Sequence, residues 1–408
     1  MALPEEARAS EITFLPVDYE PTLSLEKSLG GRARRLWEER FAECAEYASD
    51  AAYIPTGIGD APEDNTGVKI WKYGDGAQVP SYIDLDQQFG RVPKLLFLPA
   101  STFATDHVAG LCAVAEKYKS MGVKKIIVLL TALAHERQDH QFPDEHGNPI
   151  LQVTMLKQMV NNFADSVIDG VLLVQPHSLR PIEMALRNEF PLLPLDAFKF
   201  MVIGAELKKV ANPFVLGPDK GRRDEARMLA AYLHCPMGTA PKIRDRLHAG
   251  KPDVRIPDEV LAYIHDHQCN VIVFDDEIRE GGTMGDIAKK LDGYANSLTI
   301  CAVKPIFAQA TGGGKNNDGK PLTAIDHLNK AVISKIVVTD AVHPLIEPSV
   351  LAAKLQVLKL GPELANLANY LQRHLVEPDN PDWLRDPSET RTLLRLDLSV
   401  EQIEEAPR

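Results

Sequence analysis

The feature that most constrains the fold is an alternation of short apolar runs and helical patterns along most of the chain. Short apolar runs bounded by turn residues are typical of buried strands, and strands that alternate with helices are typical of parallel sheets with helices on their faces. The sequence therefore predicts an α/β protein. The strands are expected at Lys94–Leu98, Lys125–Leu130, Gly170–Val174, Phe214–Leu216, Asn270–Phe274, Leu298–Val303 and Lys335–Val338.

Helical patterns fill most of the segments between these strands. A helix is also expected before the first strand, at Ser24–Ala48, and another after the last, where leucines recur at helical spacing. Those leucines are Leu360, Leu364, Leu367 and Leu371. The helices between strands are expected at Val108–Ser120, Leu151–Phe163, Arg223–Leu233 and Pro257–His267.

The number of strands favours two successive α/β domains, because a single sheet would have to accommodate all of them. A junction is expected near Pro191–Asp196, where two prolines interrupt the pattern. The expected segments are an N-terminal extension over residues 1–65, domains over 66–200 and 201–345, a closing helix over 346–375 and a polar tail over 376–408.

Composition narrows the class of protein. The formal net charge of −12 argues against a nucleic-acid or membrane-surface partner. The chain has no apolar stretch long enough to span a bilayer, and its first residues lack the pattern of a signal peptide. Its 5 cysteines are scattered, as is usual for reduced thiols. These features predict a cytoplasmic protein.

The stretch Val271–Thr283 carries the clearest chemistry. An apolar run leads into Asp275 and Asp276, and a Gly281–Gly282 turn then leads into a helical pattern from Met284 to Leu291. Paired carboxylates can bind ribose hydroxyls or a hydrated metal ion. Glycines at a helix N-terminus let backbone N–H groups approach a phosphate. The stretch therefore predicts a site for a phosphorylated sugar.

Further motifs follow other predicted strands. Together with the acid and glycine stretch, their order and spacing resemble the ribose-phosphate diphosphokinases (PRPP synthetases) from Trp71 to Leu375. The resemblance implies two tandem phosphoribosyltransferase-type (type I) domains, each a mainly parallel sheet flanked by helices, with ATP on the first and ribose phosphate on the second. The motifs are Lys72–Gln78, Glu136–His140, Gln175–Ser178, Gly217–Gly221, Lys242–Arg244 and Val337–Asp340.

The resemblance implies an enzyme that transfers the diphosphoryl group of ATP to the anomeric hydroxyl of ribose 5-phosphate and releases AMP. Such a transfer requires Mg²⁺ and cations near the developing charge. By this resemblance Lys242 and Arg244 are catalytic, and His177 and Asp219 hold the metal. The nucleotide would contact Asp75, Arg137, Gln138, Asp139 and His140, and the acceptor Asp275, Asp276, Arg279, Glu280, Gly281, Gly282 and Thr283.

The chain departs from the family pattern at the acceptor loop. Where the family has Asp-Asp-x-x-Asp-Thr-Gly-Gly-Thr, this sequence has Arg279 and Glu280 in place of the third Asp and the first Thr. A carboxylate beside a phosphate is repulsive. Either Glu280 points away, or Arg279 neutralises it, or the acceptor carries no terminal 5′-monophosphate. The last explanation predicts a 5′-substituted ribose phosphate such as ADP-ribose.

Other departures leave two further functions open. The altered Ala77, Gln175, Arg279 and Glu280 favour a non-catalytic regulatory homologue, and the retained Lys242 and Arg244 oppose it. A phosphoribosyltransferase that consumes PRPP would share the acceptor loop, but such proteins usually have one domain of this kind. Lys304 also replaces a family residue. The resemblance also implies a homo-oligomer. For Arg137 and Gln138 a role as solvated loop residues remains possible. Two other motifs, the P-loop-like spacing at Gly314–Lys320 and His265–Cys269, are interpreted as a connecting loop and a helix end.

Overall fold

The computed structural model describes two compact units within the chain. The N-terminal unit consists of the described residues within 22–200, 341–343 and 359–408, and the C-terminal unit of those within 201–340 and 344–358. The described residues are 36–37, 39–40, 42–53, 70–72, 78–80, 84–102, 105–138, 154–219, 222–243, 253–310, 314–315, 319–376 and 394–395.

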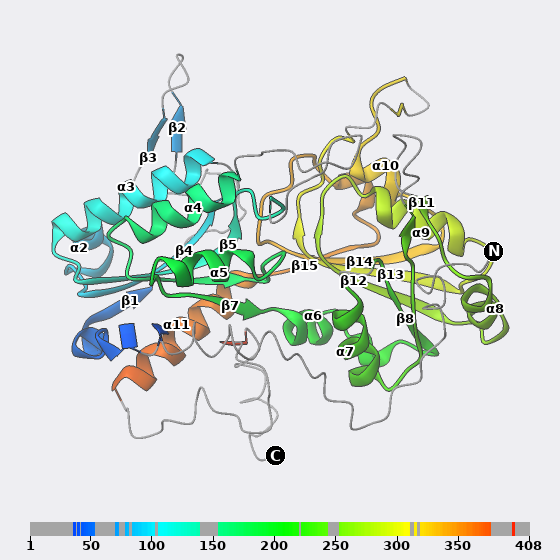
Figure 1. Ribbon diagram of the computed structural model, residues 1–408, viewed down its shortest axis with the longest axis horizontal. Helices are drawn as coiled ribbons and strands as arrows, with labels where there is room; N and C mark the ends of the chain where they lie inside the picture. The colour runs from blue at the N-terminus through cyan, green and yellow to red at the C-terminus, as the bar shows by residue number, and fades with distance from the viewer. Residues whose placement is uncertain are drawn as a thin grey trace. The chain divides into compact units, whose positions relative to one another are not determined.

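A six-stranded parallel sheet forms the centre of the N-terminal unit (Figure 1). Its strand order is β1-β4-β5-β6-β7-β16. The inner strands are almost entirely apolar and buried, as expected of a parallel sheet covered on both faces. The strands are β1 (Ala51–Tyr53), β4 (Leu95–Thr102), β5 (Lys125–Leu133), β6 (Gly170–Val174), β7 (Leu192–Asp196) and β16 (Leu394–Arg395).

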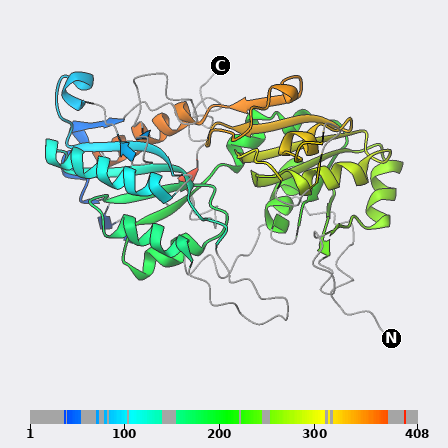
Figure 2. The ribbon, with the colours of Figure 1, turned by 90° about the horizontal axis from the view of Figure 1, so that it is seen from above.

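Helices cover both faces of this sheet. Three of them connect neighbouring strands in one direction, so right-handed crossovers put them on the same face: α3 (Thr105–Met121), α4 (Met155–Ala164) and α5 (Arg180–Arg187). The long helix α11 (Leu360–Val376) contacts β1 and the 3₁₀ helix η2 (Ala45–Asp50), and Figures 1 and 2 show it near these blue segments. Smaller elements are α2 (Leu85–Phe89) and the antiparallel pair β2 (Ile70–Lys72) and β3 (Gln78–Pro80).

The leucine repeat near the C-terminus is the apolar face of α11. Leu360, Leu364, Leu367 and Leu371 are at most 1% exposed, which confirms the predicted amphipathic helix. Gln372 Nε2 also donates a 2.9 Å hydrogen bond to the carbonyl oxygen of Ala48. This hydrogen bond attaches α11, near the C-terminus, to η2, near the N-terminal end of the described residues.

The C-terminal unit has a second six-stranded parallel sheet, in the order β15-β14-β13-β12-β8-β9. Two short antiparallel strands, β10 (Lys242–Ile243) and β11 (Asp253–Val254), follow its edge strand. The strands of the sheet are β8 (Pro213–Gly217), β9 (Met237–Thr239), β12 (Asn270–Ile278), β13 (Ser297–Pro305), β14 (Ile333–Thr339) and β15 (Leu355–Leu358).

The direction of the chain reverses between β8 and β12. From β8 it passes through α7 (Arg223–Leu233) to β9 on one side, whereas from β12 it passes through α9 (Gly282–Leu291) to β13 on the other. Connections that leave two neighbouring strands in opposite directions open a crevice at the carboxyl ends of those strands, and ligands bind there in open α/β sheets. The topology therefore predicts a ligand site at the carboxyl ends of β8 and β12.

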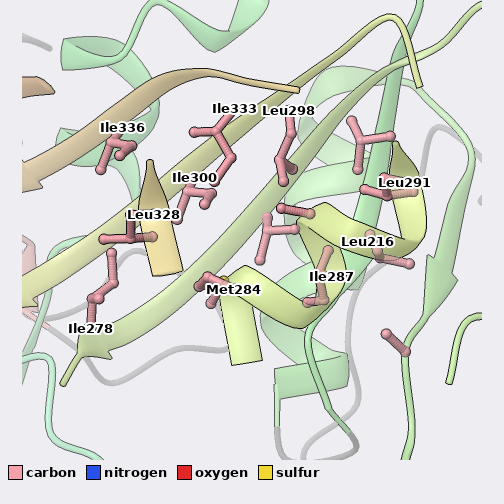
Figure 3. Packing of buried hydrophobic residues seen from close by; sticks show 14 of the residues in the cluster. Leu216, Ile278, Met284, Ile287, Leu291, Leu298, Ile300, Leu328, Ile333 and Ile336 are labelled. Carbon is pink, nitrogen blue, oxygen red and sulfur yellow. The ribbon is translucent and has the colours of Figure 1, made fainter. Parts of the chain in front are cut away.

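One face of this second sheet packs against α8 (Asp258–Asp266), α9 and α10 (Ala324–Leu328). Figure 3 shows side chains of α9 and of the strands meeting in this core. Burial of such side chains stabilises each by roughly 1.5–3 kcal/mol. The labelled members are Leu216, Ile278, Met284, Ile287, Leu291, Leu298, Ile300, Leu328, Ile333 and Ile336.

The remaining elements are α6 (Phe198–Gly204), which spans the boundary of the two units, and the 3₁₀ helices η3 (Leu207–Lys209) and η5 (Ser349–Leu351). Gln356 Nε2 donates to the carbonyl oxygen of Gly204, which attaches the end of α6 to β15. Within the described residues, no helix combines the length and apolarity that a bilayer span requires.

The predicted fold class is confirmed, since both units are parallel sheets with flanking helices. All seven predicted strands are present, but the interpretation of Pro191–Asp196 as a junction is wrong. Leu192–Asp196 is strand β7, paired with β6 over its length. Its five residues include Pro194, and a proline lowers the strand signal because it cannot donate to the ladder. Of the predicted helix at Ser24–Ala48, only residues from 36 onward are described.

Candidate active site

The acid pair lies inside a strand and not beyond its end. The prediction that the strand stops at Phe274 is wrong, because β12 continues to Ile278 and pairs Glu277 with Lys304 of β13. Asp276 is 2% exposed, so its carboxylate is almost completely removed from water. Burying a charge this far is costly unless a partner compensates it.

That partner is Arg222, which the sequence analysis did not single out. Its Nη2 lies 2.7 Å from Asp276 Oδ1, and its Nε lies 3.3 Å from Asp275 Oδ1. Its third nitrogen, Nη1, lies 3.0 Å from Glu225 Oε1. Arg222 is itself only 8% exposed. One guanidinium therefore joins the start of α7 to the acid pair of β12, at the crevice that the strand order defines.

Local geometry explains how one guanidinium reaches two consecutive residues of a strand. Successive strand side chains normally point to opposite faces. Here the backbone N–H of Asp276 donates a 2.9 Å hydrogen bond to Asp275 Oδ1, so the Asp275 carboxylate turns back along its own chain. Asp219, which follows β8, accepts a 3.2 Å hydrogen bond from the backbone N–H of Arg222. The structure thus gathers the predicted residues Asp219, Asp275 and Asp276 around Arg222.

The charged groups around Arg222 shift one another's pKa values. Burial raises the pKa of Asp275 well above its usual range; Asp276 and Asp219 raise it further, and Arg222 opposes them. Burial alone would lower the pKa of Arg222, but Asp276, Asp275 and Glu225 outweigh it and raise that pKa. Arg222 therefore stays protonated. The two buried carboxylates repel each other, so a nearby positive charge stabilises their ionised forms.

The glycine turn forms the N-terminus of α9, as predicted. Gly281 has a φ of 70° in the left-handed region. A Cβ atom there would lie 3.1 Å from the carbonyl oxygen of Ala324. Glycine is thus required both by the backbone and by the approach of α10. A Cβ at Gly282 would meet nothing within 4 Å, so Gly282 borders open space at a helix end whose first N–H groups suit an anion, and the next residue, Thr283, is half-buried.

Two charged residues, Arg279 and Glu280, precede the glycine turn, and the backbone of Arg279 is held by a hydrogen bond. The carbonyl oxygen of Arg279 accepts a 2.7 Å hydrogen bond from Ala308, which follows β13. The Nε of Arg279 lies 3.5 Å from Glu277 Oε1, so this cation faces a carboxylate of β12. Glu280 is half-buried next to Gly281. The three explanations offered for Glu280 all remain compatible with this arrangement.

In the N-terminal unit, Glu136 holds the predicted nucleotide residues together. Its side chain is 6% exposed. One oxygen accepts the N–H of Leu133 at 2.7 Å and the other accepts the N–H of His177 at 2.9 Å. The carboxylate therefore ties the segment after β5, which carries Arg137 and Gln138, to the segment after β6. Glu136 belongs to the motif Glu136–His140, but its residue type and spacing alone predicted no role for it.

The two neighbours of Glu136 differ in their surroundings. Gln138 Oε1 accepts a 2.8 Å hydrogen bond from the backbone N–H of Met155, so it caps the first turn of α4. Gln138 therefore has a structural contact that was not predicted, and its contact with the nucleotide stays a prediction. Arg137 is exposed. Gln175 has a φ of 39°, and its Oε1 accepts the N–H of Ala197 at 3.1 Å.

The proposed metal ligands fall into different units, His177 in the N-terminal and Asp219 in the C-terminal unit. Among the described residues, no group of three or more His, Cys, Asp and Glu side chains is placed to hold a metal ion. The backbone of Lys242 pairs with Val254 in β10 and β11. The side chain of Lys242 and the predicted residues Asp75, Asp139, His140 and Arg244 lie outside the described part of the chain.

Comparison with known proteins points to one family. The chain is 27% identical over 252 residues to a ribose-phosphate pyrophosphokinase of Saccharolobus solfataricus, which covers 60% of this chain and 77% of the relative. It is 27% identical over 243 residues to the protein of that name from Sulfolobus acidocaldarius, covering 58% and 72% of the two chains. The Methanobrevibacter smithii protein of that name is 23% identical, with 63% and 83% covered.

A solved structure supports the fold. The phosphoribosylpyrophosphate synthetase of Mycobacterium smegmatis superposes with a TM-score of 0.54 and 18% sequence identity, over 76% of this chain and 91% of that chain. No protein-family model matches the chain. The sequence relatives are moderate in identity but agree in name, and the structural neighbour supports the α/β fold.

Proposed function

Since the chain is a divergent member of the ribose-phosphate pyrophosphokinase family, we propose that it transfers the diphosphoryl group of ATP to the anomeric hydroxyl of ribose 5-phosphate or a related 5′-substituted ribose phosphate, with release of AMP. The observation that carries the proposal is the arrangement at the ends of β8 and β12. There an acid pair bound by Arg222 and a glycine-led helix N-terminus lie close to each other in the chain, at the crevice of the sheet.

In this proposal the acceptor is bound by groups of two kinds. Asp275 and Asp276 accept hydrogen bonds from the ribose hydroxyls, because ionised carboxylates are acceptors. The N–H groups of Gly282 and Thr283 face the 5′-phosphate, where the positive end of α9 favours an anion. Arg279 and Glu280 border the same turn and would decide what the phosphate may carry.

The nucleotide side is proposed in the N-terminal unit. Arg137, Gln138, Asp139, His140 and Asp75 would contact ATP, with Glu136 fixing the segments that present Arg137 and His177. Lys242 and Arg244 would offset the negative charge that develops on the transferring group. They follow the edge strand β9, a position from which a short two-stranded flap can close over the reacting phosphates and exclude water.

Mg²⁺ would enter with ATP as part of the substrate. The carboxylate of Asp219 is the oxygen donor that Mg²⁺ prefers, and Mg²⁺ usually keeps several waters and substrate phosphate oxygens beside one or two protein ligands. From the resemblance, Asp219 and His177 are proposed as residues that would hold a nucleotide-bound ion, and the ion would supply positive charge to the phosphates. Assembly into a homo-oligomer, as the resemblance implies, is part of the proposal.

One observation favours a second candidate, a non-catalytic regulatory homologue. Gln175 stands where the family has an acid near the metal, and its carbonyl oxygen is hydrogen-bonded to Ala197. An amide cannot replace the charge of a carboxylate at such a position. Ala77, Arg279 and Glu280 depart from the family in the same direction. A phosphoribosyltransferase is the third possibility, but it does not use ATP, so the residues proposed to contact ATP would have no function in it.

The test is to incubate the purified chain with Mg-ATP and a panel of ribose 5-phosphate, ADP-ribose and free ribose, and to measure AMP. Acceptor-dependent AMP supports the diphosphotransferase, and preference for ADP-ribose supports the 5′-substituted acceptor. Consumption of PRPP with a free base would indicate the transferase instead. Lack of both activities, combined with binding to an active relative, would indicate the regulator. Lys242→Ala should abolish AMP release.

A further inference from the structure

The acceptor site contains a cation that belongs to the protein. Resting on the proposed function, we propose that Arg222 is a positioning residue that takes the place of a divalent metal ion at the Asp275–Asp276 pair. It fixes both carboxylates in the orientation that receives the ribose hydroxyls and keeps metal ions away from them. Mg²⁺ then acts only as the ion that enters with the nucleotide.

The contacts of Arg222 are those of an ion held by acids. Its Nη2 and Nε face Asp276 and Asp275 at 2.7 and 3.3 Å. The remaining nitrogen faces Glu225 at 3.0 Å. Each nitrogen of the guanidinium therefore has a carboxylate partner, and the fork geometry of arginine allows this where the single ammonium of lysine does not.

Helix formation does not explain this residue. Arg222 is the N-cap residue of α7, a position where Ser, Thr, Asp and Asn are preferred and where the helix dipole disfavours a cation. Asp219 supplies the helix start with an acceptor, because its Oδ1 receives the backbone N–H of Arg222. The arginine at this position therefore runs against the local preference of the helix, and its contacts with the acid pair account for it.

The acid pair would otherwise be a candidate metal site. Two adjacent carboxylates at a sheet edge can share a hydrated Mg²⁺ or Mn²⁺. With Arg222 in contact with both, the positive charge is already provided, and a second cation would be repelled at short range. The absence of any three-membered His, Cys, Asp or Glu group among the described residues is consistent with this division. Both Arg222 contacts go to Oδ1 atoms, and a carboxylate can accept several further hydrogen bonds.

The test uses Mn²⁺ as the probe, with the full chain free of nucleotide and its binding followed by electron paramagnetic resonance. Wild type, Arg222→Met, Arg222→Met with Asp276→Asn, and Lys289→Met are compared. Lys289 is an exposed lysine of α9, so its variant controls for the loss of one positive charge. We expect Arg222→Met to gain a Mn²⁺ site about tenfold or more tighter than any in wild type, since one freed carboxylate contact is worth that factor. The Asp276→Asn change should remove the gain, and Lys289→Met should show none.

The same proteins are titrated with ribose 5-phosphate by calorimetry without metal. Arg222→Lys keeps the charge but not the fork, so its affinity should fall about tenfold while ATP affinity stays within about twofold. If Arg222→Met does not fold, the calorimetric comparison of Arg222→Lys with wild type still tests the proposal.

The proposal is overturned if wild type already holds Mn²⁺ at the acid pair, if Arg222→Met gains no site, or if Arg222→Lys loses ATP and sugar affinity equally. Both readouts are independent of turnover. A chain that releases no AMP but gains the Mn²⁺ site in Arg222→Met would refute the diphosphotransferase and retain the role of Arg222.

Discussion

Replacing Arg222 by Met should destabilise the C-terminal unit strongly. The change removes the guanidinium that faces both Asp275 and Asp276, and Asp276 is 2% exposed. Two unit charges 4 Å apart interact by about 4 kcal/mol at an effective dielectric constant of about 20. Removing one member of a buried ion pair costs about 3–5 kcal/mol, because the other charge stays buried. We expect a loss of that size at pH 7.5.

Hydrogen exchange read by mass spectrometry measures this loss where it occurs. Peptides of β12 and α7 report the C-terminal unit separately from the N-terminal unit, which a single melting curve does not. Peptides of β5 serve as the internal control and should exchange as in wild type. A companion variant with both Arg222→Met and Asp276→Asn should recover part of the stability, because it removes the uncompensated charge.

The loss should also depend on pH. The pKa of Asp275 is raised in the folded protein, so the native state binds this proton more readily than the unfolded chain does. Stability from this group therefore falls as the pH rises from the unfolded pKa through the raised folded pKa. Without Arg222 that pKa rises further, so the difference between variant and wild type should shrink at lower pH. Equal exchange of β12 in both proteins, or additive losses in the double variant, would refute the reasoning.

Three further predictions concern neighbouring groups. Asp275→Asn should raise the unfolding temperature at neutral pH and leave it unchanged at acid pH, where the wild-type carboxyl is protonated; a decrease at neutral pH would contradict the pKa assignment. Gly281→Ala should cost about 1–3 kcal/mol in urea unfolding, because a Cβ there combines a φ of 70° with a 3.1 Å approach to Ala324. Glu136→Gln should lower stability by about 1–3 kcal/mol by turning an amide NH₂ toward a backbone N–H, and calorimetry should show weaker ATP binding; unchanged values would remove its organising role.

The fold class could be predicted from the sequence because most inner strands contain a short apolar run. Gly170–Val174 and Arg223–Leu233 match their predicted bounds. Other strands are longer than predicted, since polar residues such as Asp275 continue a ladder that hydropathy alone ends at Phe274. Several strands escaped prediction, among them β7, which contains Pro194, and β16, because Leu394–Arg395 is too short to show a period.

The candidate site was predictable only in part. Asp275, Asp276 and the glycine turn lie close together in the sequence, so their pattern can be recognised as one site. Arg222 lies far from them in sequence, in a charged run that begins a helix, where an arginine is normally solvated. Only the pairing of β8 with β12 brings it to the acids. Glu136 was missed for a similar reason, because its partners are backbone N–H groups, which leave no mark in a sequence.

The most direct test of the central claim follows the phosphorus atoms of Mg-ATP by ³¹P nuclear magnetic resonance during incubation with ribose 5-phosphate or ADP-ribose. The account predicts that AMP appears together with an equal amount of a diphosphate bonded to the anomeric carbon of the acceptor, and that Lys242→Ala forms neither. Formation of ADP, or AMP with free diphosphate and an unchanged acceptor, would contradict it.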